Sequence, residues 1–484
     1  MLSLRDARFL RHAFVAAFVL YAITAWNSSG YHASDEHHQV IAFAQHRLGE
    51  LPVKDLAWEH ERAMRPSALP WVAVGVMLAT RAVGMTDPMM VTFILRAITA
   101  LLALLVLHRS LRVLLPAMAE RLRIPFIVIT WSLWFVPFQL VRYSGETWSG
   151  ILFFLGMLLA LNEGRTTRWP MLLGLCLMAS MWLRPPMAVA AAGLLAWLVG
   201  VRGESRATMV RIMVGMVLMS VILFVADSMF YGHVTFSPWN YSLTGISGPP
   251  EHMRTTAMPW WYYPPWVIKY ALPPIGLMLL AALATLILYD RRHPLVWCIL
   301  PFLIAHSWLP HKELRFLYPL AILTPWSIIA AWAKLRDTGI SERIPLWMIR
   351  TAITFIALFN IAGLAVVMTQ PAGTGNMAFV HSLRADDDAP VTCLIEPSEA
   401  WRIALPPFFR APVPGDTAIA PHSITGHITT PYVIAQAAQI GMVQMRSGQA
   451  FVPLAASHPA WARWSLHQYH WGERAVDWTL YRVR

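Results

Sequence analysis

The stretch His311-Lys312-Glu313-Leu314-Arg315-Phe316 decides the fold class of this chain, because it places a charged cluster between two long apolar runs. The runs cover residues 294–309 and 316–333, and each approaches the length that crosses the hydrocarbon core of a membrane. Charged side chains at that depth are costly and usually functional. A polar hairpin that only marks the water interface is the structural alternative. The stretch therefore predicts a membrane protein with a candidate site at a helix hairpin.

The composition excludes a soluble globular protein. Of the 484 residues, 57% are hydrophobic and only 13% are charged, whereas about 25% of residues are charged in an average soluble domain. The net charge of +12 could indicate a nucleic-acid partner, but no basic domain with interleaved aromatic residues is present, and we predict no such partner. Cys176, Cys298 and Cys393 lie too far apart to indicate a disulfide framework or a metal site.

Eleven apolar runs predict an all-α polytopic membrane protein. The first run follows Arg5, Arg8 and Arg11, and we interpret it as a retained signal anchor. The runs are residues 13–26, 88–107, 124–139, 147–162, 170–183, 186–200, 209–226, 271–289, 294–309, 316–333 and 346–368.

The distribution of Arg and Lys supports eleven crossings. With that number, the short loops that carry most of the cations share one side of the membrane, as expected of cytoplasmic loops. A further run, residues 69–84, is short and carries Arg81, and we predict that it is interfacial or only partly inserted. The N-terminus is then cytoplasmic, and the C-terminus is extracytoplasmic.

Two domains follow from this topology. Residues 1–368 form the transmembrane domain, and residues 369–484 lack a spanning run and form an extracytoplasmic tail domain. The tail contains short alternating segments at 391–395 and 442–445, which predict a small α/β or mostly β unit.

Polar residues gather in the predicted outer loops, at residues 27–87, 140–146, 227–270 and 310–315. The first loop carries the adjacent pair Asp35-Glu36, in which one carboxylate could remove a proton while the other positions a hydroxyl or a partner side chain. The structural alternative is that Ser34 or Asp35 caps a helix. A metal site built from His32, His37 and His38 is a third possibility, although their spacing matches no specific ligand pattern.

Taken in order, the loop motifs resemble those of the membrane mannosyltransferases of the GPI-anchor and asparagine-linked-glycan pathways. The resemblance covers about residues 10–335, and its most specific element is the 311–316 motif. The motifs are Asp35-Glu36, Trp58-Glu59 with Arg65-Pro66-Ser67, Ser144-Gly145-Glu146-Thr147, Arg184-Pro185, Tyr231-Gly232 with Trp239-Asn240, and the 311–316 motif. The resemblance implies a GT-C fold, a polyprenyl-phosphate monosaccharide donor such as dolichyl-phosphate mannose, and inversion of the anomeric centre. It implies no cofactor and no required metal.

The resemblance also implies roles for individual residues. Asp35 matches the base that deprotonates the acceptor hydroxyl, and Glu36 matches its companion. His311, Lys312 and Arg315 match the motif that contacts the donor phosphate or the leaving lipid phosphate. Possible substrate-binding residues are Glu59, Arg65, Glu146, Arg184, Trp239 and Asn240. Ala33 and Ser34 follow His32 where the family commonly has His-Pro-Asp-Glu, a departure that concerns the acceptor more than the donor.

The chemistry of the residues agrees with this expectation. A phosphate leaving group needs cations or hydrogen-bond donors where its charge develops, and Lys312 and Arg315 offer both. The sequence thus predicts a membrane enzyme that moves a hexose, mannose above all, from a polyprenyl-phosphate carrier to a glycolipid or lipid-linked glycan. Two alternatives to this function stay open. One is a related enzyme with another polyprenyl-phosphate sugar or a protein acceptor, and the other is a glycolipid transporter or flippase. A transporter would show inverted repeats and charges near the midplane.

Overall fold

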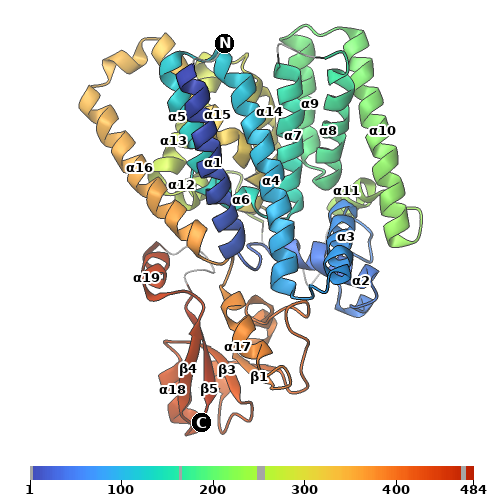
Figure 1. Cartoon of the computed structure of the whole chain (residues 1–484), viewed down its shortest axis with the longest axis vertical. Helices are drawn as coiled ribbons and strands as arrows, with labels where there is room; N and C mark the ends of the chain where they lie inside the picture. The colour runs from blue at the N-terminus through green and yellow to red at the C-terminus, as the bar shows by residue number, and fades with distance from the viewer. Residues whose placement is uncertain (1–3, 163–165, 248–256, 470–475) are drawn as a thin grey trace.

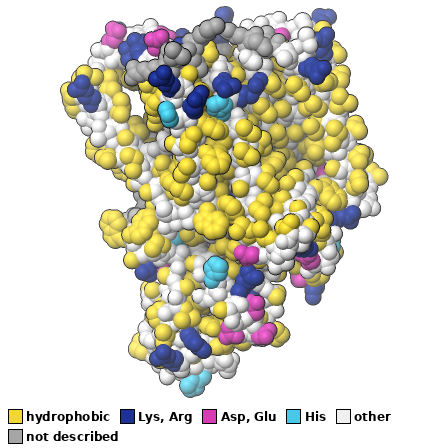
Figure 2. Space-filling view, viewed as in Figure 1, with side chains coloured by type: hydrophobic (Ala, Val, Ile, Leu, Met, Phe, Trp, Pro, Cys, Tyr) yellow, Lys and Arg dark blue, Asp and Glu magenta, His cyan; other side chains and the backbone are white. Residues whose placement is uncertain are grey.

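A body of long helices stands above a small sheet domain at the C-terminal end of the chain (Figure 1). The computed structural model describes residues 4–162, 166–247, 257–469 and 476–484. The predicted loop 227–270 therefore includes a segment, 248–256, that lies outside the described residues. Charged side chains are sparse over the middle of the body and reappear at its far end and on the sheet domain (Figure 2).

All eleven apolar runs are helical. The run 124–139 is divided between two helices, and the run 316–333 begins as a 3-10 helix, η5 (Leu314–Leu323). The helices of the body are α1 (Leu4–Asn27), α4 (Pro88–Leu114), α5 (Glu120–Ser132), α6 (Phe135–Leu140), α7 (Gly145–Leu161), α8 (Trp169–Leu183), α9 (Met187–Gly200), α10 (Arg206–Tyr231), α13 (Pro273–Tyr289), α14 (Pro294–Trp308), α15 (Thr324–Asp337) and α16 (Leu346–Thr369), with short 3-10 turns η3 (Leu115–Ala117) and η6 (Ile340–Arg343).

Five helical segments of the described chain are each long and apolar enough to cross a membrane, or up to six if α13 and α14, bent by 116°, count as one span. The five are Asp6–Asn27, Pro88–Ala117, Arg206–Tyr231, Leu314–Asp337 and Leu346–Thr369. These features are those of a polytopic membrane protein. Eleven crossings and the GT-C type stay predictions, because several of the helices are shorter than a full span.

The segment 69–84 forms α3 (Ala68–Ala82), a 15-residue helix that lies at the end of the body nearest the sheet domain (Figure 1). We call this end the tail side. Figure 1 shows α2 (Ala42–Arg47) beside α3. The other short elements are the π-helix η1 (His37–Ile41) and η2 (Val53–Asp55) before α3, and α11 (Ser237–Ser247) and α12 (Tyr263–Tyr270) after α10. That residues 69–84 are interfacial or only partly inserted in the membrane remains a prediction.

Two glycines allow α8 and α10 to approach closely. A Cβ atom at Gly174 would lie 2.0 Å from the carbonyl oxygen of Ile212, and one at Gly215 would lie 2.2 Å from that of Met171. Since real Cβ atoms do not come so near to backbone, the two helices could keep this separation only with glycine at both positions. Small residues serve the same purpose at many helix contacts in membranes.

Gly174→Ala is therefore expected to destabilise the body, by about 1–3 kcal/mol, because overpacking forces the two backbones apart. The measurement is the thermal unfolding temperature of the purified protein in detergent. Gly75→Ala in α3 is the matched control, because no heavy atom lies within 4 Å of a Cβ there and alanine favours helix more than glycine does. Equal unfolding temperatures for Gly174→Ala and Gly75→Ala would contradict the tight-contact explanation.

The tail is a mixed five-stranded sheet with helices, in the strand order β2-β1-β3-β5-β4. Strand β1 pairs in parallel with β2 and β3, whereas β5 pairs antiparallel with β3 and β4. The elements are η7 (Asn376–Phe379), α17 (Val380–Arg384), β1 (Val391–Leu394), η8 (Pro397–Arg402), β2 (Thr417–Ile419), η9 (Pro421–Ser423), β3 (Tyr432–Gln436), α18 (Ile440–Ser447), β4 (Phe451–Ala456), α19 (Ala460–Tyr469) and β5 (Trp478–Val483).

The tail is an α/β unit, as expected, but only one of its two alternating segments is a strand. Residues 391–394 form the buried strand β1, but residues 442–445 lie in helix α18. Four alternating residues are too few to separate a strand from a helix, and Gly448 in the left-handed region (φ 69°) ends α18 as glycine commonly ends helices.

The tail packs against the first loop. The amide of Ala372 donates to the carbonyl of Ser29 (2.9 Å), and Arg384 forms an ion pair with Asp87 at the start of α4 (2.9 Å). The ring centroids of Phe408 and Phe409 lie 6.3 and 5.7 Å from the ring centroid of His37. A segment late in the chain thus covers the residues that follow Asp35-Glu36.

Candidate functional site

The first loop presents Asp35 at the start of a helical segment that continues through η1 and α2. Glu36 holds this turn: its Oε1 accepts from the backbone N–H groups of His32 (3.1 Å) and Ala33 (3.2 Å), and its Oε2 pairs with Arg142 (3.5 Å). A helical segment therefore begins here, and Glu36 holds the turn that precedes η1 without capping that helix through its side chain. A π-helical turn directly after it is a feature found frequently at functional sites.

The hairpin between α14 and η5 presents Arg315. Glu313 accepts from Arg315 Nε (2.5 Å) and Nη2 (3.0 Å) and contacts His311 Nε2 (2.9 Å). Burial alone would raise the pKa of Glu313, but the hydrogen bonds and charges of His311 and Arg315 outweigh burial and lower that pKa to about 2. Glu313 is therefore ionised over the usual pH range, and it fixes the direction of the Arg315 guanidinium.

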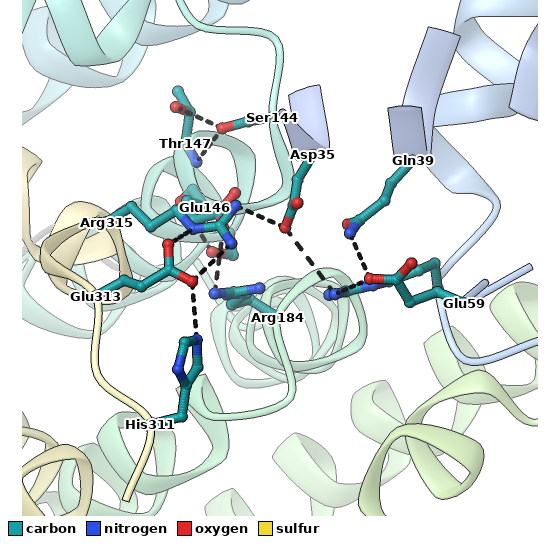
Figure 3. Close-up of polar contacts among 12 residues, drawn as sticks. Asp35, Gln39, Glu59, Ser144, Glu146, Thr147, Arg184, His311, Glu313 and Arg315 are labelled. Carbon is teal, nitrogen blue, oxygen red and sulfur yellow. Dashed lines mark hydrogen bonds and ion pairs between the residues drawn. The ribbon is translucent and has the colours of Figure 1, made fainter. Parts of the chain in front are cut away.

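The two loops meet in one ion pair. Arg315 Nη1 lies 2.6 Å from Asp35 Oδ2, although the residues are 280 positions apart in the chain (Figure 3). Both side chains are mostly buried, at 17% and 18% exposure. In such surroundings an ion pair is screened less by salt than a pair at the open surface. The first loop and the 311–316 motif therefore meet in the structure.

Further arginines and carboxylates surround this pair. Arg65 lies 3.9 Å from Asp35 and 3.2 Å from Glu59, whose Oε1 also accepts from Gln39 (3.0 Å) (Figure 3). Burial would raise the pKa of Asp35, but the attraction of Arg315, then Arg65 and Arg184, leaves that pKa below its ordinary value. Asp35 is thus held in the ionised form, which is the form that can accept a proton.

A small polar pocket of about 40 Å³ opens beside Asp35. Arg184 and Glu146 line it and form an ion pair of 3.2 Å, with both side chains 8% exposed. Arg184 belongs to the turn after α8, and Glu146 belongs to the first turn of α7, which Ser144 caps through the amide of Thr147 (3.3 Å). The structure therefore gathers Asp35, Glu36, Glu59, Arg65, Glu146, Arg184 and Arg315 in one charged cluster, which we call the Asp35 cluster.

Lys312, Asn240 and Trp239, which were singled out in the sequence, lie outside the Asp35 cluster. Lys312 is 3% exposed, and its Nζ donates to the carbonyls of Met258 (3.0 Å) and Leu309. Asn240 donates to the carbonyl of Ala63 (3.1 Å), and Trp239 is 59% exposed. Lys312 and Asn240 therefore hold loops around the cluster.

An apolar cavity of about 230 Å³ is lined in part by residues of η5. Leu314 and Leu317, on either side of Arg315 in the same helix, line it together with residues of α12, α13 and α14. Its polar members include His32 and Tyr318, whose Nε2 and hydroxyl are 2.7 Å apart. The cavity and the Asp35 cluster therefore share η5 as a common wall.

Several residues that shape the site were not among the sequence candidates. Glu313 belongs to the motif itself, and the alternation of charges within it was the available signal. Asp227 of α10 accepts from Ser67 (2.7 and 2.8 Å), Trp182 (2.8 Å) and Ser237 (2.5 Å), and so ties the first loop to α8 and α11. The sequence contains no signal for that convergence. Further such residues are Gln39, Arg142 and Tyr318.

The histidines of the first loop do not form a metal site. Within the described ranges, no group of three or more His, Cys, Asp or Glu side chains is placed to hold an ion. His32 contacts Tyr318, and His37 is buried against His38 and Phe409. Burial and the neighbouring His38 keep the pKa of His37 well below its ordinary value.

A known protein family matches most of the chain. The Alg9-like mannosyltransferase family matches residues 13–390, which include every residue of the Asp35 cluster. Among curated proteins, alpha-1,2-mannosyltransferase ALG9 of Saccharomyces cerevisiae is 29% identical over 146 residues, which are 29% of this chain and 25% of that protein. The aligned part thus spans about a quarter of that relative. The family match over most of the chain confirms the resemblance seen in the motifs: the chain belongs to the Alg9-like mannosyltransferase family.

Proposed function

We propose that the protein is an inverting membrane mannosyltransferase that uses a polyprenyl-phosphate mannose donor and a glycolipid or lipid-linked glycan acceptor. Membership of the Alg9-like family supports the transfer of mannose. The observation that carries the mechanism is the 2.6 Å ion pair between Asp35 and Arg315, because it places a carboxylate next to a cation in a largely buried site. These are the two groups that a single displacement from a phosphate ester requires.

In the proposed reaction the acceptor hydroxyl oxygen attacks the anomeric carbon of the donor sugar. The bond from that carbon to the phosphate oxygen breaks, the hydroxyl proton passes to Asp35, and the polyprenyl phosphate leaves with the electron pair. Inversion requires the base on the face of the sugar opposite the leaving group, so in this proposal the pair of Asp35 with Arg315 opens and the donor sugar lies between the two side chains. Arg315 stabilises the developing phosphate charge with its planar fork of donors, Arg65 and Arg184 add positive charge, and Glu36 and Glu313 position the two loops.

The apolar cavity suits the lipid part of such a donor. Leu314 and Leu317 face it while Arg315, between them on η5, reaches Asp35. A carrier whose first isoprene units occupied the cavity would bring its phosphate to the border with the Asp35 cluster. A nucleotide sugar has no lipid chain for the cavity to accept, so we favour the lipid-linked donor.

The test uses the purified full chain in liposomes with radiolabelled polyprenyl-phosphate mannose and a panel of glycolipid acceptors. Labelled mannose in a new α-linked glycolipid, with no transfer from GDP-mannose, is the expected result. Use of GDP-mannose alone would overturn the donor assignment. Movement of the labelled lipid across the bilayer without a new glycosidic bond would instead indicate a transporter.

The cations near Asp35 should determine how the transfer activity depends on pH. Arg65 helps to lower the pKa of Asp35, so Arg65→Gln should raise that pKa. Since the ionised carboxylate is the base, activity should then be lost at a higher pH on the acid side. The measurement is the pH profile of kcat, and Arg62→Gln is the control, because Arg62 lies over the ring of Trp58 in the same loop. An acid limb that does not move, or moves to lower pH, would contradict Asp35 as the titrating base.

A further inference from the structure

Two tryptophans project outward from α19, the last helix of the tail. Trp461 and Trp464 are 52% and 70% exposed, and a spacing of three residues places them on one face of the helix. Ala462, between them in sequence, is fully buried and packs with Val366 near the end of α16. The helix thus sits on α16 through a small residue and turns its largest apolar side chains away from the protein.

The chemistry of this face is that of a membrane interface. Indole rings combine a large apolar surface with one N–H donor, and tryptophan is enriched where hydrocarbon meets the lipid headgroups. Arg463, which lies between the two tryptophans in sequence, forms an ion pair with Asp477 (2.6 Å). The two indoles are therefore not accompanied by the charge of their immediate neighbour.

The position of α19 along α16 also fits the boundary between the hydrocarbon core and the lipid headgroups. α16 is a candidate span, and only 17% of its apolar window is buried inside the protein, so most of its surface would face lipid. A rise of about 1.5 Å per residue puts Val366 about 30 Å from Leu346 along the helix axis, which matches a hydrocarbon core of about 30 Å. Figure 1 places α19 beside the tail-side end of α16.

We propose that α19 is an interfacial helix whose Trp461 and Trp464 insert into the headgroup boundary of the leaflet on the tail side. The bilayer is the partner, because the face continues the lipid-facing surface of α16. The anchor would hold the tail domain in place while the same domain packs on the first loop through Ala372, Arg384 and Phe409. The membrane would thus help to keep the cover over His37, next to the Asp35 cluster.

The test is a depth measurement on the full chain in lipid nanodiscs. A nitroxide label is attached to Trp464→Cys, and its collision rates with oxygen, which concentrates in lipid, and with a water-soluble nickel complex are compared. Two controls bracket the result: Leu358→Cys in the middle of α16, 59% exposed, and Met445→Cys in α18, 82% exposed near the far end of the tail. Cys298 and Cys393 are buried, and Cys176 is replaced by alanine in every variant.

The expected ratio of oxygen to nickel collisions at position 464 is severalfold higher than at position 445 and lies between the two controls. A ratio equal to that at 445 would mean that α19 is bathed in water, and it would overturn the proposal. Low rates for both reagents, with spin–spin broadening that vanishes when labelled protein is diluted with unlabelled protein, would mean that a second copy covers the face. That result would also overturn it. None of these readouts depends on the catalytic activity.

Discussion

Asp35→Asn is expected to reduce transfer of labelled mannose by a factor of about 10²–10⁴, the range that general base catalysis contributes. Asparagine keeps the size of the side chain but cannot take the proton from the acceptor hydroxyl. The loss should fall on kcat, because the donor phosphate is bound by the arginines and not by Asp35. The measurement is the initial rate in proteoliposomes at saturating donor and acceptor.

Asp55→Asn is the matched control for that variant, because Asp55 is an exposed carboxylate in η2 of the same loop and belongs to no contact of the Asp35 cluster. It should retain the wild-type rate. Folding of Asp35→Asn is checked by its thermal unfolding temperature, since Arg315 keeps its two hydrogen bonds to Glu313. A correctly folded Asp35→Asn with undiminished transfer would remove Asp35 as the base.

Arg315→Gln is expected to lower kcat/KM for the lipid-linked donor by about 10²–10³, the cost of removing one donor to a developing oxyanion. Asp35 and Glu313 together hold the Arg315 guanidinium, and we expect the donor phosphate to take the place of Asp35 beside it. Arg315→Lys should recover only part of the rate, because an ammonium keeps the charge but cannot present two parallel N–H groups.

Lys312→Ala separates contact with the phosphate from support of the hairpin. Its ammonium donates to two backbone carbonyls, so we expect weaker donor use with a smaller effect than that of Arg315→Gln, accompanied by a lower unfolding temperature. The measurements are donor kinetics and thermal unfolding of both variants. If Arg315→Gln left kcat/KM for the donor unchanged, the phosphate role of Arg315 would be excluded.

Much of the fold could be predicted because the driving force for a membrane helix is local. A run such as 346–368 is apolar enough by itself to predict a helix, and its neighbours need not be known. The sheet domain was predicted less well, since a strand depends on partners far away in the chain. β1 could be recognised from its alternation, whereas 442–445 alternates in the same way and is helical.

The candidate site was predicted in its residue types and only partly in its contacts. The charges of Asp35 and Arg315 at the ends of apolar runs were visible, because charge near a membrane is rare and costly. The hydrogen bonds of Lys312 to two carbonyls and those of Glu36 to the amides of His32 and Ala33 were not visible. Each depends on where one backbone carbonyl or amide lies in space, and residue spacing does not determine that.

The sequence by itself determined that this chain is a helical membrane protein, that its tail lacks a spanning run, and that it carries the motifs of one mannosyltransferase family. Hydrophobic length and local charge are properties of a segment, and they do not change when the segment packs. Only the tertiary structure decided that Arg315 pairs with Asp35 at 2.6 Å and that Phe409 covers His37. Such contacts join residues hundreds of positions apart, and the packing of helices and tail alone sets the distance between them.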